Sequence, residues 1–343
     1  MLTYLKGSTA IASAQAYRIL SPTDLPNQPL TEFAAVVLEG LSEIPKRLSS
    51  RYLYDDRGSE LFREIMDLEE YYPTRCEAEI LSVHGREIAR TFQSEELNLV
   101  DLGAGDGVKT LQLLGSLADQ RVDVRYVPID ISEGAMADLT ARITQAMPDV
   151  SVAGLVAEYT SALHWLTAQG DGRRNFVLFL GSNIGNFNKA QARTFLRRLW
   201  SVLNEDDYVL IGFDLKKDID RLLDAYNDAK GVTAQFNLNL LTRINRELGG
   251  HFDATKFRHY STYDVFSGAM ESYLVSMQEQ TVAVDALNTE FAFLPWEPVH
   301  TEYSYKYLES DIADLANATG FAIDGMFSDD NGWFCGSLWK VCK

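Results

Sequence analysis

The residues best suited to ligand chemistry form a glycine-rich turn between an apolar strand and a helix. The segment Leu99-Val-Asp-Leu-Gly-Ala-Gly-Asp-Gly107 places Asp101 ahead of Gly103, Ala104 and Gly105, and Lys109 follows in the next helix. Glycines let the backbone approach a ligand closely at the carboxyl end of a first strand. Their spacing differs from the pattern that admits a pyrophosphate. The acid before them suits a ligand with a cationic amino-acid end.

Two further acids follow the next two predicted strands. Asp130 lies near the end of a strand over Arg125–Ile131, where a carboxylate can accept hydrogen bonds from both hydroxyls of a ribose. Glu158 follows a strand over Ser151–Val156 and either faces an adenine or is a plain surface acid. The pair of Asp101 and Asp130 is typical of class I methyltransferases, which use S-adenosylmethionine (SAM). A dinucleotide such as NAD is the specific alternative.

A parallel sheet would bring these acids together at one edge, and the pattern of the sequence predicts such a sheet. Apolar runs alternate with helical patterns, which indicates an α/β fold with a doubly wound sheet. The predicted strands are 97–102, 125–131, 151–156, 176–180 and 208–213, and the predicted helices include 76–92, 132–145 and 190–203. Beyond Asp214 we expect a helical stretch over 219–249, antiparallel strands within 259–310, a helix over 308–319 and a closing strand over 334–341.

Composition excludes several classes of partner. The chain has 343 residues and a net charge of −18, with no basic cluster, so nucleic acid and anionic membrane are poor partners. A small zwitterionic or cationic substrate fits better. Three cysteines without metal-ligand spacing favour free thiols and a cytoplasmic location, and no apolar run or signal-peptide pattern opposes that. The five histidines also lack ligand spacing, so we expect no metal site. We expect a monomer.

Five motifs occur in one order along the chain. They are Tyr52-Leu-Tyr-Asp-Asp-Arg-Gly-Ser-Glu-Leu-Phe62, Glu70-Tyr-Tyr-Pro-Thr-Arg75, Leu180-Gly-Ser-Asn-Ile-Gly-Asn186, Ala225-Tyr-Asn-Asp-Ala-Lys-Gly-Val-Thr-Ala-Gln-Phe-Asn237 and His300-Thr-Glu-Tyr-Ser-Tyr-Lys306. Together they resemble the histidine Nα-methyltransferase family of ergothioneine biosynthesis. The resemblance runs from about residue 30 to the C-terminus, and the first thirty residues lie outside it.

The resemblance implies a fold and a reaction. A Rossmann-like class I methyltransferase domain, residues 76–215 with 307–343, would bind SAM. A second α+β domain, residues 20–75 with 216–306, would bind the amino acid. Methyl groups would pass stepwise to the α-amine, up to a trimethylated betaine, with S-adenosylhomocysteine as the other product.

The resemblance also implies where the amino acid binds. Asn186 and Tyr226 would hold the α-carboxylate, and Asn186 and the backbone of Gly181 would lie near the amine. Tyr54 would lie beside the α-amine, orient its lone pair and act as the catalytic residue.

Three residues would hold the imidazole ring: Tyr71, Glu302 and Ser304. Glu302 and Ser304 are two apart, so on a strand they face the same way, and a carboxylate beside a hydroxyl suits an imidazole. Ser272 departs from the family, whose histidine-specific members carry Met there. Because serine is smaller than methionine, the pocket for the ring leaves room for other amino acids as substrates, such as tryptophan, a tryptophan derivative or tyrosine. A catalytically silent module that only binds SAM and an amino acid is the non-enzyme alternative.

Overall fold

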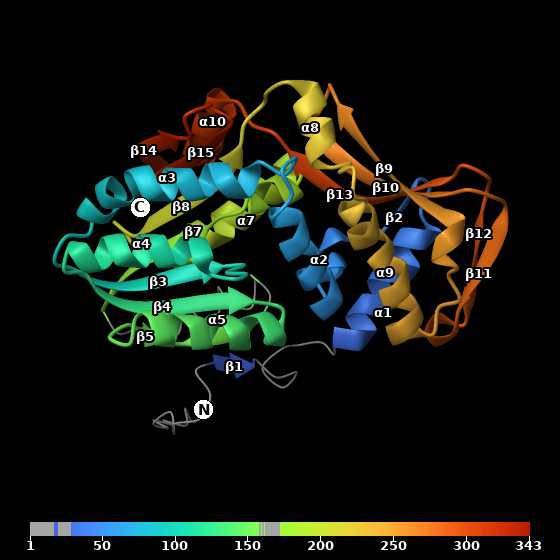
Figure 1. Cartoon of the computed structure of the whole chain (residues 1–343), viewed down its shortest axis with the longest axis horizontal. Helices are drawn as coiled ribbons and strands as arrows, with labels where there is room; N and C mark the ends of the chain where they lie inside the picture. Colours follow the sequence, from blue (N-terminus) through green and yellow to red (C-terminus); the bar gives the residue numbers. More distant parts are fainter. Residues whose placement is uncertain (1–16, 20–28, 158, 160, 162–171) are drawn as a thin grey trace.

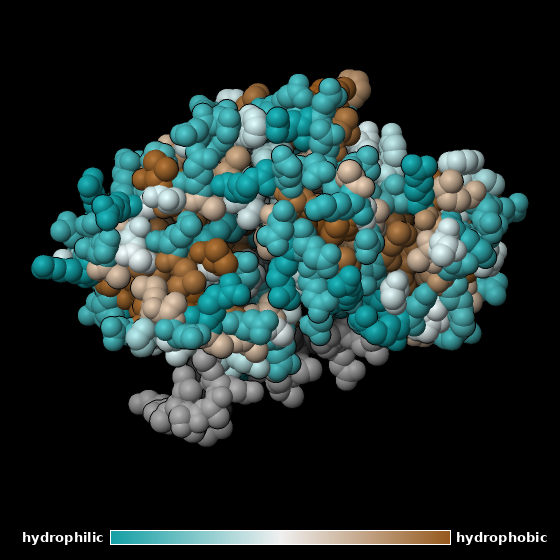
Figure 2. All heavy atoms as spheres, in the orientation of Figure 1, coloured by the Kyte–Doolittle hydropathy of each residue, from teal (hydrophilic) through white to brown (hydrophobic). Residues whose placement is uncertain are grey.

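A computed structural model describes residues 17–19, 29–157, 159, 161 and 172–343 of the chain. Glu158 and the residues before Tyr17 therefore lie outside the described part. The ribbon separates into a part built around a large sheet and a part built around a smaller sheet (Figure 1). Most of the surface on the face shown in Figure 2 is hydrophilic, as the acidic composition predicts.

The large sheet has the strand order β1-β6-β4-β3-β7-β8-β15-β14, with β5 paired to β4. From β6 to β8 its strands are parallel, whereas β15 runs antiparallel to both neighbours. The order reverses around β3, which puts a ligand crevice at the carboxyl ends of β3 and its neighbours. The strands are Tyr17–Ile19 (β1), Glu96–Leu102 (β3), Asp123–Asp130 (β4), Ser151–Val152 (β5), Gly154–Val156 (β6), Arg174–Phe179 (β7), Tyr208–Asp214 (β8), Phe321–Ser328 (β14) and Phe334–Val341 (β15).

Helices cover both faces of this sheet, which is why its central strands are apolar on both sides. One face packs against α3 (Pro73–Arg90), α4 (Val108–Asp119) and α5 (Glu133–Ala146). The other packs against α7 (Lys189–Val202) and α10 (Glu309–Thr319). Ser132 caps α5, because its side chain accepts a hydrogen bond from the backbone N–H of Ala135.

The smaller sheet has the order β2-β13-β10-β9 and packs against α9. The contact between them is apolar, with rings such as Phe236 of α9 and Phe257 of β9. This sheet and the elements around it are α1 (Pro29–Ser42), β2 (Lys46–Arg47), η1 (Ser50–Leu53), α2 (Asp56–Met66), α8 (Ile219–Ala225), α9 (Val232–Leu248), η3 (Ala254–Lys256), β9 (Phe257–Asp264), β10 (Ala269–Ser276), β11 (Gln280–Val284), η4 (Asp285–Leu287), β12 (Thr289–Phe293) and β13 (Pro298–Tyr305).

The structure differs from the predicted elements in several places. The helical stretch over 219–249 is two helices, because the loop before Gly231, which has a φ of 72°, ends α8 and precedes α9. The predicted strand over 151–156 is two short strands, β5 and β6, and the strands β1 and β2 were not predicted. The strand β14 was not predicted either: it lies at the end of the sheet order, and Asp324 and Gly325 interrupt its apolar residues. Within the described residues, no helix is both long and apolar enough to cross a membrane.

Candidate functional site

The glycine turn lies between β3 and α4 and opens onto the main cavity. Gly103, Gly105 and Gly107 all have positive φ, between 56° and 75°, so this turn favours glycine at three positions. A Cβ added to Gly105 would meet nothing within 4 Å. The backbone here therefore borders open space, as a turn that cradles a ligand must.

Asp130 and Asp101 both line this cavity, which has a volume of about 880 Å³. The carboxylate of Asp130 accepts hydrogen bonds from the backbone N–H groups of Gly105 and Ser132, each at 3.0 Å. Burial raises the pKa of Asp130 above its ordinary value. Each carboxylate oxygen still has a lone pair available for a ligand hydroxyl.

Asp101 is held from behind by two hydroxyl groups. Its Oδ2 accepts hydrogen bonds from Thr110 Oγ1 at 2.6 Å and from Tyr126 OH at 2.9 Å. Burial raises the pKa of Asp101 to about 6, although these two bonds act to lower it. The buried glycine turn, the two acids and the open space beside Gly105 fit the ribose and amino-acid ends of SAM.

Lys109 also lines the cavity and forms an ion pair with Glu77, a buried acid on α3. The same carboxylate accepts the backbone N–H of Gly181, with both oxygens 2.9 Å from the nitrogen. Glu77 therefore joins the helix after the glycine turn to the loop after β7. With its N–H already bonded, Gly181 can offer a substrate only its carbonyl oxygen.

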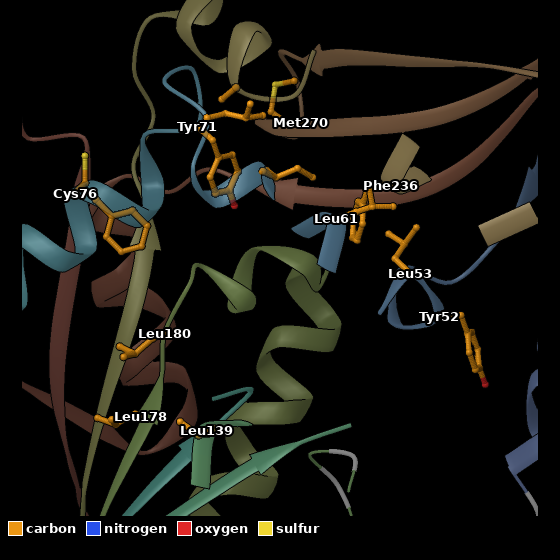
Figure 3. Packing of buried hydrophobic residues seen from close by; sticks show 14 of the residues in the cluster. Tyr52, Leu53, Leu61, Tyr71, Cys76, Leu139, Leu178, Leu180, Phe236 and Met270 are labelled. Carbon is orange, nitrogen blue, oxygen red and sulfur yellow. The ribbon is translucent and has the colours of Figure 1, made fainter. Parts of the chain in front are cut away.

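Aromatic rings form the wall at the other end of the cavity. The ring of Tyr54 packs edge-on against Phe62 and Phe236, with centroids 5.4 Å and 5.3 Å away. Tyr71 packs against Phe62 at 6.1 Å and against Tyr226 at 6.4 Å. Tyr71 and Phe236 reach this region from the segment before α3 and from α9 (Figure 3). These contacts fix the orientation of both tyrosines.

The phenol of Tyr54 stays protonated near neutral pH. Burial, followed by the nearby charge of Glu302, raises the pKa of Tyr54 well above its ordinary value. A phenol in this state can donate or accept a hydrogen bond but does not act as a phenolate base. Tyr54 is therefore suited to orienting a neighbouring group.

Glu302 is a half-buried acid that lines the cavity. Within the described residues, no hydrogen bond or ion pair reaches its carboxylate, and burial raises the pKa of Glu302 to about 7. It lies on β13 next to a register shift in the pairing with β10. There Thr301 turns inward and donates a hydrogen bond to Asn237 of α9 at 2.7 Å. Such irregularities re-aim side chains in strands.

A buried polar cluster lies behind the ring wall. Tyr226 OH donates to Ser304 Oγ at 2.7 Å, and Lys306 donates to both hydroxyls. Lys306 also pairs with Asp214 at the end of β8. Tyr226 and Ser304 line a smaller cavity of about 40 Å³, which shares Tyr54, Tyr71 and Glu302 with the main one.

Most of the predicted site residues surround the two cavities. The main cavity is lined by Tyr54, Tyr71, Asp101, Gly103, Ala104, Gly105, Lys109, Asp130, Gly181, Asn186 and Glu302. Ser272 lines neither cavity: it is buried behind Glu302 and reaches the site only through that neighbour. Ser272 therefore has no surface in either cavity through which it could contact a substrate directly. Glu158 lies outside the described residues.

The sequence analysis did not identify Glu77, Lys306 or Asp214 as part of the site. One signal for Glu77 was present, because it is an acid at helical spacing from the apolar residues Ile80 and Leu81. Its partner Gly181 lies 104 residues away, so the pairing itself needs the fold. Lys306 belongs to a quoted motif, but nothing in its spacing indicates that it is buried.

Residues 33–341 match the family described as histidine-specific, SAM-dependent methyltransferases. The chain is 38% identical to histidine N-alpha-methyltransferase of Mycolicibacterium smegmatis, over 82% of this chain and 87% of that protein. It is 36% identical to ergothioneine biosynthesis protein 1 of Neurospora crassa, over 80% of this chain and 31% of that protein. The L-tryptophan methyltransferase trpM of Psilocybe serbica is more distant, at 27% identity over 88% and 90%.

Proposed function

Because the chain belongs to the family of histidine-specific, SAM-dependent methyltransferases, we propose that it methylates the α-amino nitrogen of free L-histidine, up to the trimethylated betaine. SAM is the methyl donor and S-adenosylhomocysteine the second product. The reaction would belong to ergothioneine biosynthesis, as the name of one relative suggests.

The observation that carries the choice of histidine is the carboxylate of Glu302. It is half-buried in the cavity wall that it shares with Tyr54 and Tyr71, and the described residues give it no hydrogen-bond partner. A ligand that fills the cavity removes this carboxylate from water, which is costly without a partner, so a ligand group that donates a hydrogen bond is expected there. An imidazole N–H meets that need, and Ser304 on the same strand lies beside it.

The residues of the cavity would then bind and orient both ligands. Asp130 would accept the ribose hydroxyls of SAM, and Asp101 would lie at its amino-acid end. SAM supplies an electrophilic methyl group when bound. Asn186 and Tyr226 would hold the carboxylate of histidine, which aims its amine along the cavity. Alignment of this kind is worth several kcal/mol of the barrier.

The amine must be neutral to react, because an ammonium has no lone pair. Burial in the cavity lowers the pKa of an amine. The phenol oxygen of Tyr54 would then accept one amine N–H, and the carbonyl of Gly181 lies on the same wall to accept another. The lone pair is thereby left to face the methyl donor. The ring of Tyr54 also accommodates the quaternary product through a cation–π contact, worth about 0.5–2 kcal/mol.

We also propose that the protein acts in the cytoplasm as a monomer. All three cysteines are free thiols, and two of them, Cys76 and Cys335, are buried. This agrees with a reducing compartment. Gel filtration with light scattering would test the monomeric state.

Methyl transfer assayed across the twenty amino acids, with product masses read directly, tests the proposal. We expect histidine to be the preferred substrate, with mass increases of one to three methyl groups. Preference for tryptophan or tyrosine would reassign the substrate and leave the methyltransferase class intact. SAM binding without any transfer would indicate the silent module.

A further inference from the structure

Lys306 is fully buried, and each N–H of its ammonium has a partner within the described residues. The nitrogen lies 2.7 Å from Asp214 Oδ2, 2.9 Å from Tyr226 OH and 2.8 Å from Ser304 Oγ. A lysine ammonium has three donors and no acceptor. Lys306 therefore uses its whole donor set and can only donate to the two hydroxyls.

Those bonds decide what Ser304 can do. A hydroxyl oxygen accepts at most two hydrogen bonds. Ser304 Oγ accepts one from Lys306 and one from Tyr226 OH, at 2.8 and 2.7 Å. Its own proton is then left to donate elsewhere. Lys306 also donates to Tyr226 OH, at 2.9 Å, so the phenol oxygen already accepts a hydrogen bond and the bond between the two hydroxyls runs from Tyr226 to Ser304. Without the lysine, this bond could reverse and use the proton of Ser304.

The cation is anchored by a carboxylate that stays charged. Although burial acts to raise it, Lys306 and Lys217 hold the pKa of Asp214 below its ordinary value. Tyr72 also donates a hydrogen bond to Asp214, at 2.8 Å. Lys217 contacts Asp214 and Tyr72, and no bond joins it to Tyr226 or Ser304. The two lysines thus share an anion but differ in what else they contact.

We propose that Lys306 is a specificity-positioning residue that makes Ser304 a hydrogen-bond donor toward the substrate ring. The ring pocket would then present one acceptor, Glu302, and one donor, Ser304. A neutral imidazole offers the matching pair, an N–H and an unprotonated nitrogen, whereas an indole or a phenol has no ring nitrogen acceptor. This inference rests on the proposed function and deepens it: Ser304 is already expected at the ring, and Lys306 is the residue that sets the direction of its hydrogen bond.

Two ring analogues of histidine separate the two contacts. The ring of 4-thiazolylalanine has an acceptor nitrogen and no N–H, and the ring of 3-thienylalanine, with its sulfur in the matching position, has neither. The ratio of their dissociation constants therefore reports the donor alone. We expect the wild type to bind thiazolylalanine about tenfold more tightly, the effect of one hydrogen bond. Calorimetry with S-adenosylhomocysteine present measures both constants.

The variant Lys306→Met should reduce this ratio to about one, and Lys217→Met, the matched control, should keep it near ten. A ratio that stays near ten in Lys306→Met, with both analogues weakened alike, would show a merely structural role and overturn the inference. If Lys306→Met does not fold, Ser304→Ala carries the test: its ratio should also fall to about one, and an unchanged ratio overturns the inference.

The same measurements separate this inference from the proposed function. A wild type that neither binds nor methylates histidine contradicts the proposed function. A wild type that methylates histidine but binds the two analogues equally contradicts the role of Lys306 alone.

Discussion

Glu302 lies directly opposite Ser272 where β13 pairs with β10, yet only Glu302 lines the cavity. Opposite residues of an antiparallel pair project from the same face of a sheet. A side chain at position 272 longer than serine would therefore extend alongside the carboxylate that we assign to the ring of the substrate. The preference for one substrate ring over another thus depends on the direct contact with Glu302 and on the size of residue 272 beside it.

Replacing Glu302 tests the direct contact. We expect Glu302→Ala to lower kcat/KM for histidine about a hundredfold, or about 2–3 kcal/mol, because a ring N–H loses its charged partner. Relative activity toward aromatic amino acids should rise, because the site no longer penalises an apolar ring. Glu290→Ala, an exposed acid on β12, is the control. An unchanged histidine preference in Glu302→Ala would remove Glu302 from the ring site.

The raised pKa of Glu302 predicts a pH dependence. With a folded pKa of about 7, the carboxylate is charged above that pH and protonated below it, so histidine binding should weaken as pH falls through 7. Calorimetry from pH 6 to 8.5 measures this. Glu302→Gln should lack the effect but keep the changes due to the titration of histidine itself. Identical profiles for the two proteins would contradict the assignment.

The same shift has an opposite consequence for stability. Folding raises the pKa of Glu302 from 4.5 to about 7, so the folded protein binds more protons than the unfolded chain between these values. The free energy of unfolding should therefore fall as pH rises through that window. Denaturant unfolding at pH 5 and pH 7.5, compared with Glu302→Gln, would measure this contribution.

Asp130 is the residue to change at the cofactor end. We expect Asp130→Ala to weaken SAM binding by roughly 1–3 kcal/mol, through loss of charge-assisted hydrogen bonds to the ribose. The residue ends β4, so the fold should survive, and circular dichroism checks this. Asp149→Ala, an exposed acid, is the control. Equal SAM affinity by calorimetry in Asp130→Ala and wild type would reject the ribose contact.

Position 272 tests the indirect contact. We expect Ser272→Met to sharpen the preference for histidine over tryptophan, because the longer side chain narrows the space beside Glu302. Ser276→Met, on the same strand and outside both cavities, controls for general overpacking. A rise in tryptophan activity relative to histidine in Ser272→Met would contradict this account.

The sheet and the cofactor end could be predicted from the sequence because their signals are local. Asp101 and the glycines lie within seven residues, and each apolar run bounded by turns became a strand. The strand β14 was not predicted because Asp324 and Gly325 interrupt its apolar residues in the middle. The helical pattern over 219–249 continues across Gly231 in the sequence, so the turn between α8 and α9 was not predicted.

The polar cluster behind the ring wall could not be predicted, because its contacts are distant in sequence. Lys306 meets Asp214 and Tyr226, about 90 and 80 residues earlier in the chain. Only the fold brings the end of β8, the segment after α8 and β13 to one point. Tyr72 belongs to one of the five motifs, but only the structure shows that its hydroxyl donates a hydrogen bond to Asp214.

Glu77 has a consequence for how the two ligands influence each other. One carboxylate holds Lys109, on the cofactor side of the cavity, and the backbone of Gly181, on the amino-acid side. A shift of that carboxylate on binding of either ligand would be felt at the other. Binding would then be cooperative, and by thermodynamic reciprocity each ligand would change the affinity for the other by the same factor. Replacing Glu77 would accordingly be expected to change the factor by which each ligand alters the affinity for the other.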